Sequence, residues 1–305
     1  MNKYIVSTTI NPPTEAILKY DAMDDWTLVV AGDLKTPSNY TLERGIYLTP
    51  EDQRKMDPIL SDLIGWNCIQ RRMFSILYAY KNGADVIAII DDDNIPLENW
   101  GQDIHIDTPV ELDYYMVDGI AFDPVSVTNH NNIWHRGFPL QLLGSRFNHT
   151  KTRNNVTPKV QADFWNGDPD IDAICRMEHA PVCDFNSEHF PLAGDKIAPF
   201  NSQNTFMSGS ILKDYFLFPG IGRMDDIWAS FYLQAKGHSV IFGKASVFQQ
   251  RNEHDLTVDL EAEIPGMLNS LSILQDMTSD GPDAIFKYLP KKSVNAYKQY
   301  LTHFE

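Results

Sequence analysis

An unbroken apolar run, Val86–Ile90, is the clearest signal in the pattern of hydrophobic and polar positions along the chain. The run is rich in valine and isoleucine, and it is bounded by Gly83 before it and Pro96 after it. Such a short run is typical of a central strand that is buried on both faces. Similar stretches predict further strands over 4–10, 26–31, 45–48 and 240–248.

Helical periodicity is strongest over 66–81, where apolar residues recur every three or four positions and Asn82-Gly83 ends the pattern. Thr14 is the predicted N-cap of a short helix through Tyr20, and 50–63 is expected to be partly helical. The tail, 256–305, is predicted to be mostly helical, with interruptions at Pro265 and at Gly281-Pro282.

The middle of the chain is less regular. Two stretches, 118–124 and 132–139, resemble strands rich in aromatic residues, whereas 144–162 is polar and predicts a mobile loop. Strands that alternate with helices predict an α/β fold. The strand–helix–strand order at the beginning of the chain is that of a doubly wound nucleotide-binding sheet.

Three aspartates follow the apolar run directly. Strand alternation places Asp91 and Asp93 on one side, roughly 6–7 Å apart, and Asp92 on the other. Two carboxylates in this arrangement can flank one hard divalent cation, which prefers oxygen ligands and keeps positions open for phosphate oxygens. The alternative is a solvated acidic turn after a strand.

Arg71 and Arg72 lie near the start of the predicted helix over 66–81. Arginine at a helix start opposes the helix dipole, so these residues need another reason for their position. A bound phosphate is one such reason, and a surface arginine pair is the alternative. Because this helix leads into the aspartate strand, the two features together predict a metal–diphosphate site.

Several later segments carry donors and acceptors suited to a sugar or a nucleotide. Asp33, after the second strand, is a candidate acceptor for a base or ribose, or a simple turn residue. The stretch around Trp134 and Arg136 suits a sugar pocket or an aromatic hairpin. The polar run 200–205, which includes Asn204, suits a hydroxyl-rich ligand or a polar edge strand.

Two aspartates open a predicted helix near 225. One of Asp225 and Asp226 is expected to serve as its N-cap, which leaves the other as a general base or a sugar ligand. The sequence does not decide which carboxylate has which role. His254 is a candidate third metal ligand or a loop histidine.

Composition narrows the class of protein. The 305 residues suffice for one large or two small domains, and the formal charge of −16 argues against a nucleic-acid-binding surface. The three cysteines fit neither a disulfide framework nor a zinc motif. The chain has no signal-peptide pattern and no apolar stretch long enough to span a membrane, so a soluble, cytoplasmic protein is expected.

Taken together and in order over 4–262, these segments resemble the STELLO-type glycosyltransferases of the GT-A fold. The matching pieces are Thr8–Thr14, Gly32–Pro37, the Asp91–Asp93 triplet, Arg136–Pro139, Gly167–Asp172, Phe200–Thr205, Gly222–Trp228 and Gln250–Asp255. The resemblance implies a mixed, mostly parallel sheet flanked by helices. It also implies a single catalytic domain over 1–260, with a nucleotide-sugar half (1–98) and an acceptor half (99–260), followed by a helical extension over 261–305. Those relatives are membrane-anchored, so this chain is expected to be a free catalytic domain.

The expected activity is metal-dependent transfer of a sugar from a nucleoside-diphosphate sugar, such as a UDP-sugar, to an unidentified acceptor. Mn²⁺ or Mg²⁺ would be held by Asp91, Asp93 and His254, and the expected catalytic residues are Arg71, Arg72, Asp225 and Asp226. The expected nucleotide-sugar contacts are Thr8, Asp33, Lys35, Arg71, Asp91, Asp92, Arg136 and Asn204. The helical tail is a candidate contact with a second copy of the chain.

A more distant resemblance is to the UDP-arabinopyranose mutases, which share the aspartate triplet. In that family an arginine shortly after the Arg-Gly-aromatic-Pro segment becomes glycosylated. Here Leu143 occupies that position and Arg146 is the nearest arginine, and Gln250 occupies the position of a mutase histidine. The alternatives are therefore a UDP-sugar mutase and a non-catalytic nucleotide-sugar-binding protein. A nucleotidyltransferase is less favoured, because Asn11-Pro12-Pro13 replaces the usual glycine-rich loop.

Overall fold

The computed structural model describes residues 1–250 and 255–305. Its strands form one open mixed sheet in the order β3-β2-β1-β4-β10-β8-β11-β9-β6-β7, with β5 paired to β11. The strands are β1 (Lys3–Thr9), β2 (Thr27–Gly32), β3 (Ile46–Leu48), β4 (Val86–Ile90), β5 (Asn94–Pro96), β6 (Val110–Val117), β7 (His149–Val156), β8 (Val160–Gly167), β9 (Leu192–Gly194), β10 (Asn204–Ser208) and β11 (Val240–Gln249). The α-helices are α1 (Glu15–Asp21), α2 (Pro50–Met56), α3 (Pro58–Ile64), α4 (Arg72–Lys81), α5 (Ala173–His179), α6 (Asp225–Ala235), α7 (Leu256–Asp280) and α8 (Lys291–Leu301).

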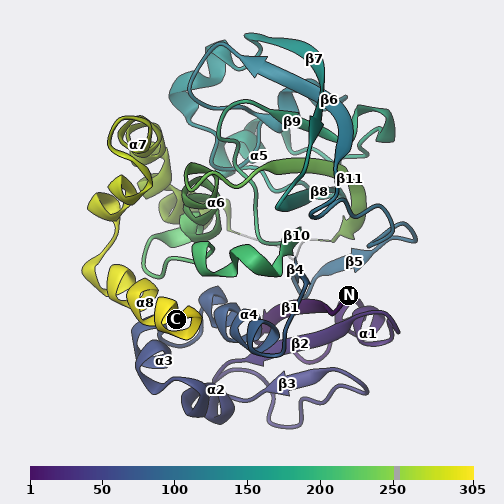
Figure 1. The fold of residues 1–305 in the computed structure, drawn as a ribbon, viewed down its shortest axis with the longest axis vertical. Helices are drawn as coiled ribbons and strands as arrows, with labels where there is room; N and C mark the ends of the chain where they lie inside the picture. The colour runs from purple at the N-terminus through teal and green to yellow at the C-terminus, as the bar shows by residue number, and fades with distance from the viewer. Residues whose placement is uncertain (251–254) are drawn as a thin grey trace.

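The first half of the sheet is parallel and matches the predicted order of elements. β1 pairs with β2 and β4, and β2 pairs with β3. The apolar run Val86–Ile90 is β4 and is buried along its whole length, as predicted for a central strand. Thr14 caps α1, and α4 packs on β1 and β2. Figure 1 shows α4 and α6 on one side of the strands and α1 on the other, so the predicted α/β class with flanking helices is confirmed.

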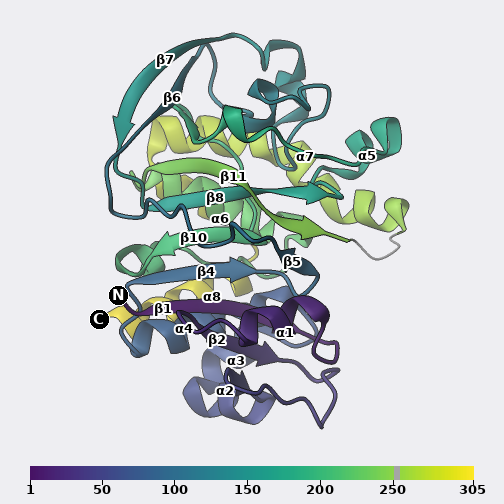
Figure 2. The ribbon, with the colours of Figure 1, turned by 90° about the vertical axis from the view of Figure 1, so that its right-hand side faces the viewer.

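One antiparallel strand, β10, brings distant segments to one edge of the sheet. It lies between β4 and β8 and runs against both, with Asn204 opposite Ile90. The chain therefore enters β10 beside the point where β4 ends. Because β8 and β11 are parallel to each other and antiparallel to β10, their carboxyl ends reach the same edge. Figure 2 shows β4, β8 and β11 pointing toward that edge.

Two expectations for local structure are wrong, and one predicted helix is present but begins later than expected. The stretch predicted as a mobile loop contains β7, which pairs with β6 along its length; its side chains are mostly exposed and polar, and this gave it the pattern of a loop. The stretches 118–124 and 132–139 are mainly turns, in which Asp123 accepts backbone N–H groups and Gly137 has a φ of +86°. The predicted helix over 66–81 begins later, as a 3₁₀ turn (Ile69–Arg71) followed by α4.

The C-terminal helices pack back onto the rest of the protein. α7 packs against α5 and α6, and α8 packs against α3. The interruption predicted at Pro265 is wrong, because α7 continues through it and ends at Gly281. Contacts on the following turn hold this part of the helix in place: Gly266 lies against Met224, and Ser270 accepts a hydrogen bond from the Trp228 indole. The boundary expected at 260 therefore falls inside a helix. No helix in the described part of the chain is long and apolar enough to span a membrane.

Candidate active site

A cleft of about 300 Å³ lies where β4, β8 and β11 end and β10 begins. Strand ends in α/β sheets are the usual location of ligand sites. All but two of the lining residues carry polar or charged side chains. The walls are formed by Ile69, Asp91, Asp93, Arg136, Asp170, Ser202, Gln203, Gly222, Arg223, Asp225, Asp226 and Gln249. Segments separated by more than a hundred positions in the sequence therefore meet at one site.

The aspartate triplet divides between two pockets, as the alternation of strand side chains predicted. Asp91 and Asp93 line the cleft, whereas Asp92 lines a neighbouring pocket of about 230 Å³. There the Asp92 carboxylate accepts hydrogen bonds from the Thr9 hydroxyl and the Asn11 amide. Each carboxylate of the triplet thus borders a pocket, and Asp92 and Asp93 form a turn directly after β4.

The structure gives the two neighbouring arginines different surroundings. The Arg72 guanidinium is buried, pairs with the Asp91 carboxylate and donates to the Ser202 carbonyl and hydroxyl. Arg72 thus fixes one cleft carboxylate in position, although it was predicted to contact phosphate directly.

Arg71 points away from the aspartates, contrary to the expected phosphate contact. It donates to the Gln53 side chain at 2.8 Å and to Ser61 and the Gly65 carbonyl at 3.2 Å. Its guanidinium also stacks on the Trp66 ring, 3.7 Å from the centroid. The Arg71 donors are therefore occupied by acceptors on and beside α2 and α3. These contacts join the start of α4 to those helices, and this packing explains the position of Arg71.

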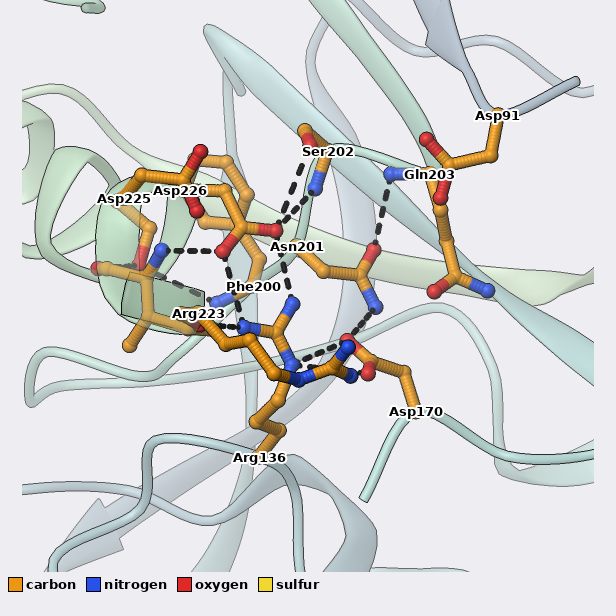
Figure 3. Close-up of polar contacts among 12 residues, drawn as sticks. Asp91, Arg136, Asp170, Phe200, Asn201, Ser202, Gln203, Arg223, Asp225 and Asp226 are labelled. Atoms are coloured by element: carbon orange, nitrogen blue, oxygen red, sulfur yellow. Dashed lines mark hydrogen bonds and ion pairs between the residues drawn. The ribbon is translucent and has the colours of Figure 1, made fainter. Parts of the chain in front are cut away.

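Arg136 lies at the centre of the cleft wall, where its guanidinium joins two carboxylates (Figure 3). Nε donates to Asp170 at 2.8 and 3.0 Å, and the two Nη atoms donate to Asp226 at 3.1 and 2.9 Å. One Nη also donates to the Arg223 carbonyl. These two carboxylates raise the pKa of Arg136 well above its usual value, although burial alone would lower it.

Asp225 and Asp226 lie in the first turn of α6, but neither is its N-cap. The N-cap position belongs to Met224, which makes no side-chain capping bond. The Asp226 carboxylate accepts from Arg136 and from the Ser202 N–H, whereas Asp225 accepts from the Gln70 amide at 2.8 Å. Burial and the charge of Asp226 raise the pKa of Asp225 to about 7. The two neighbouring carboxylates therefore have different partners, an arginine for Asp226 and a neutral amide for Asp225.

The charges in the cleft suit a divalent cation. Five carboxylates line it, and three arginines (Arg72, Arg136 and Arg223) lie in or directly behind its wall. Arg72 and Arg136 pair with cleft carboxylates, whereas Arg223 pairs with Asp259 and Glu263 outside the cleft, so the acids of the cleft outnumber the arginines that compensate them. Within 1–250 and 255–305, no three His, Cys, Asp or Glu side chains are close enough together to hold a metal ion. The predicted third ligand, His254, lies outside the described residues, and Gln250 is exposed.

Four other residues were expected to contact the nucleotide sugar, and one of them, Thr8, borders a pocket. Thr8 lines the smaller pocket beside Asp92, and its hydroxyl donates to the Ala31 carbonyl. Asp33 is buried and accepts the Leu34 and Cys68 N–H groups, as its turn interpretation predicted. Lys35 is exposed. Asn204 is buried inside the sheet, where it bonds to the Trp100 indole and the Ser246 hydroxyl instead of facing the cleft.

The aromatic sugar pocket expected around 134–138 is not formed by the described residues. Trp134 is buried and donates to the Asp172 carboxylate, and Phe138 is also buried. Two glutamines lie in the cleft instead: Gln203, from the predicted polar run 200–205, donates from its amide to the side chain of Gln249 at 2.8 Å. Sequence reasoning missed Gln249. Gln249 ends β11, and its place beside β4 could be recognised only once the strand order was known.

A larger cavity of about 430 Å³ lies elsewhere, at the beginning of β11. Its charged groups are already paired: Asp195 contacts Lys196, and His238 contacts Asp214. The cleft at the strand ends, which combines five carboxylates with amide groups, is chemically the better candidate for an active site.

Sequence comparison agrees with the resemblance drawn from the motifs. No family model matches the chain. Two proteins of Arabidopsis thaliana, the probable glycosyltransferases STELLO2 and STELLO1, are 24% and 23% identical to it over 228 residues. This region is 68% of the present chain but only 30% and 29% of the relatives, so the chain spans less than a third of their length.

Among solved structures, glucosyl-3-phosphoglycerate synthase from Mycobacterium tuberculosis covers 89% of the chain, and the match includes 80% of the synthase. The identity is 12% and the TM-score is 0.45 for its complex with Mn²⁺, UDP-glucose and phosphoglyceric acid. This similarity is distant, and the α/β architecture described above follows from the strand order itself.

Proposed function

We propose that this protein is a metal-dependent glycosyltransferase that uses a nucleoside-diphosphate sugar, with a UDP-sugar as the favoured donor. The observation that carries the proposal is the division of the aspartate triplet between two adjoining pockets. Asp91 and Asp93 face a cleft with excess negative charge, and Asp92 faces a smaller pocket that shares Ile69 with the cleft. One donor molecule could occupy both pockets, with its diphosphate at the cleft aspartates. The resemblance to probable glycosyltransferases supports the same activity.

Asp91 and Asp93 would hold Mn²⁺ or Mg²⁺ from one side, because hard cations prefer carboxylate oxygens and accept phosphate oxygens at their open positions. When bound, such a cation neutralises the diphosphate and makes it a better leaving group. Arg72 would hold Asp91 in the required position and add positive charge behind the leaving diphosphate. Asp93→Ala is expected to abolish transfer while the fold is retained.

The smaller pocket has the character of a nucleobase site. Its walls include the apolar side chains of Ile10 and Ile69, which are 46% and 40% exposed and thus available for contact with a flat ring. Asn11 and Asn67 supply amide groups at the rim, where they could read the edge of a base. Thr8 and Asp92 complete the pocket on the side of β1 and β4.

Asp225 is the favoured acceptor-activating base. Its carboxyl accepts from the neutral Gln70 amide and from the backbone N–H of Asp226, whereas the Asp226 carboxylate is paired with Arg136 and accepts from Ser202. A carboxyl whose pKa is about 7 can take a proton from an acceptor hydroxyl near neutral pH. Asp226, paired with Arg136, would lie beside it.

The surroundings of Arg146 favour a transferase over a mutase that glycosylates itself. The Arg146 guanidinium is buried, pairs with the Asp123 carboxylate at 2.9 Å, and donates to the Ile133 and Asn131 carbonyls. Leu143, at the position of the modified arginine in the mutases, carries no nucleophile. Neither side chain therefore offers a reactive, accessible guanidinium.

The decisive experiment is thermal unfolding with UDP, GDP and a panel of their sugars, each with and without Mn²⁺. A ligand at a hundredfold excess over its Kd stabilises the folded state by about 2.7 kcal/mol. The expected result is a Mn²⁺-dependent rise in Tm that Asp93→Ala removes. Glu98→Gln is the matched control, because it removes one exposed acid outside both pockets. The absence of any metal-dependent shift would refute the proposal.

A further inference from the structure

We infer that Arg136 is a positioning residue that holds Asp226, and through it the first turn of α6, in the geometry that transfer requires. This inference rests on the proposed function, but it concerns a residue that the motifs assigned to nucleotide-sugar binding. In the structure, the Arg136 donors are directed at protein groups and not toward open space in the cleft.

The contacts of Arg136 join three separate parts of the chain. Nε holds Asp170, which follows β8, while the Nη atoms hold Asp226 on α6 and the carbonyl of Arg223 just before it. The side chains of Arg136, Asp170 and Asp226 are each less than a tenth exposed. The planar guanidinium of arginine directs its N–H donors at fixed angles, like a fork, and can bind two carboxylates at once, whereas lysine offers a single ammonium group. This geometry fixes the position of α6 relative to the ends of the strands.

Both carboxylates also accept hydrogen bonds from the segment just before β10. Asp226 accepts the Ser202 N–H at 3.1 Å, and Ser202 also accepts from Arg72, which pairs with Asp91. Asp170 accepts from the Asn201 amide at 2.9 Å. Figure 3 shows Arg136 between these two carboxylates, with Asn201 and Ser202 on their far side. The proposed base, Asp225, is adjacent in sequence to Asp226, so its position depends on the same fork.

Replacement by lysine removes the fork. The lysine ammonium reaches about as far as the Arg136 Cζ atom, one bond short of all three guanidinium nitrogens, so a single ammonium cannot reproduce the paired contacts to Asp170 and Asp226. The positive charge stays in the buried cluster, which favours retention of the fold. Arg136→Lys is therefore expected to release Asp226 from Ser202 and to lower kcat on the order of a hundredfold, as small misplacements of catalytic groups do.

The test combines a crystal structure of Arg136→Lys with titration calorimetry using UDP and Mn²⁺, and with kinetics. The expected results are a displaced Asp226 carboxylate, a Kd for UDP within about twofold of wild type, and a reduced kcat. Arg146→Lys is the matched control, because Arg146 forms another buried arginine–aspartate pair, with Asp123, outside the cleft. It is expected to leave kcat and the position of Asp226 unchanged.

Two outcomes would overturn the inference. An Asp226 carboxylate that keeps its position in Arg136→Lys would exclude a positioning role, whether or not the protein is active. A weakened Kd for UDP with kcat retained would make Arg136 a direct ligand contact. If wild-type protein neither binds UDP nor turns over, the proposed transferase function fails, while the crystal structure still decides the positioning role.

Discussion

At the scale of single residues, the neighbours of each carboxylate decide its chemistry. Asp225 and Asp226 are adjacent in sequence and equally buried, at 5% exposure each. The Asp226 carboxylate accepts from the Arg136 guanidinium, whereas Asp225 accepts from a neutral amide and lies beside Asp226. Burial and the charge of Asp226 therefore bring the titration of Asp225 near the pH at which a base is useful.

This difference predicts the pH dependence of transfer. Burial and Asp226 raise the pKa of Asp225 to about 7, and a base must be deprotonated to act. The value of kcat/KM is therefore expected to rise about tenfold per pH unit below 7 and to level off above it. Asp225→Asn should lower kcat strongly and remove the rise of kcat/KM with pH below 7. A profile that is flat between pH 5.5 and 8, or one that Asp225→Asn leaves unchanged, would assign the base to another group.

At the scale of elements, close backbone contacts fix how the helices meet. Gly222, just before α6, has a φ of +66°, and a Cβ there would lie 2.0 Å from the Ala262 carbonyl oxygen on α7. Glycine is the residue that fits both the backbone angle and this distance. The contact joins α6, which carries Asp225, to the C-terminal helix α7.

Gly222→Ala is accordingly expected to lower the free energy of unfolding by about 2 kcal/mol or more, since the strained angle and the clash add together. Gly237→Ala is the matched control: its φ is +92°, but no atom lies within 4 Å of the added Cβ. Urea denaturation of both variants measures the difference. Equal losses would show that backbone angle alone matters at Gly222.

A buried network links three central strands and predicts a second pH effect. The Asp163 carboxylate on β8 accepts from the Ser246 hydroxyl on β11, and Ser246 accepts from the Asn204 amide on β10. Burial raises the pKa of Asp163 to about 7, whereas the unfolded value is about 4. The folded state therefore binds the proton more tightly, and this group's contribution to stability falls as pH rises from about 4 through 7.

Asp163→Asn removes this titration. The stability of the variant relative to wild type is expected to increase between pH 5 and pH 7, by at most about 1.4 kcal/mol per pH unit. Urea unfolding at several pH values measures the slope, so a constant offset from altered hydrogen bonding does not affect the result. A relative stability that stays level across this range would contradict the prediction.

At the scale of the whole molecule, the last helix, α8, packs against both the middle of the chain and helix α3. Tyr297 and Tyr300 on α8 are buried against Phe216, with ring centroids 5.6 and 5.1 Å from its ring. Gln299 and His303 donate to the Asp57 carboxylate, which is the N-cap of α3. The helical extension expected over 261–305 is thus in extensive contact with the region expected to be catalytic.

Removal of residues 290–305 is expected to abolish cooperative unfolding or to lower Tm sharply, because burial of each tyrosine contributes about 2 kcal/mol. Circular dichroism melts of the truncated and full chains measure the effect. Tyr300→Phe is a milder comparison that keeps the ring and loses its hydrogen bond to the Leu212 carbonyl. An unchanged melt after truncation would make the extension a separable unit.

The parts of this molecule that could be predicted from sequence are those set by local pattern. The apolar run of β4, the cap at Thr14 and the alternation of Asp91, Asp92 and Asp93 depend on neighbours within a few positions. The exposed strand β7 and the helix that continues through Pro265 were not predictable in this way, because pairing and packing override their local composition. Arg71 and Arg72 differ for the same reason: their roles depend on Gln53 and Asp91, which the sequence does not place beside them.

The alternation at the end of β4 also limits which insertions and deletions the sequence can accept during evolution. Apolar substitutions within Val86–Ile90 would leave the assignment of acids to pockets intact. Loss or gain of one residue in that strand would instead turn every following side chain to the opposite face. After the loss of one residue, Asp92 would face the cleft, Asp93 would face the smaller pocket, and Asp91 would enter the buried strand. Lineages that keep this site should therefore vary in the composition of the strand while preserving its length.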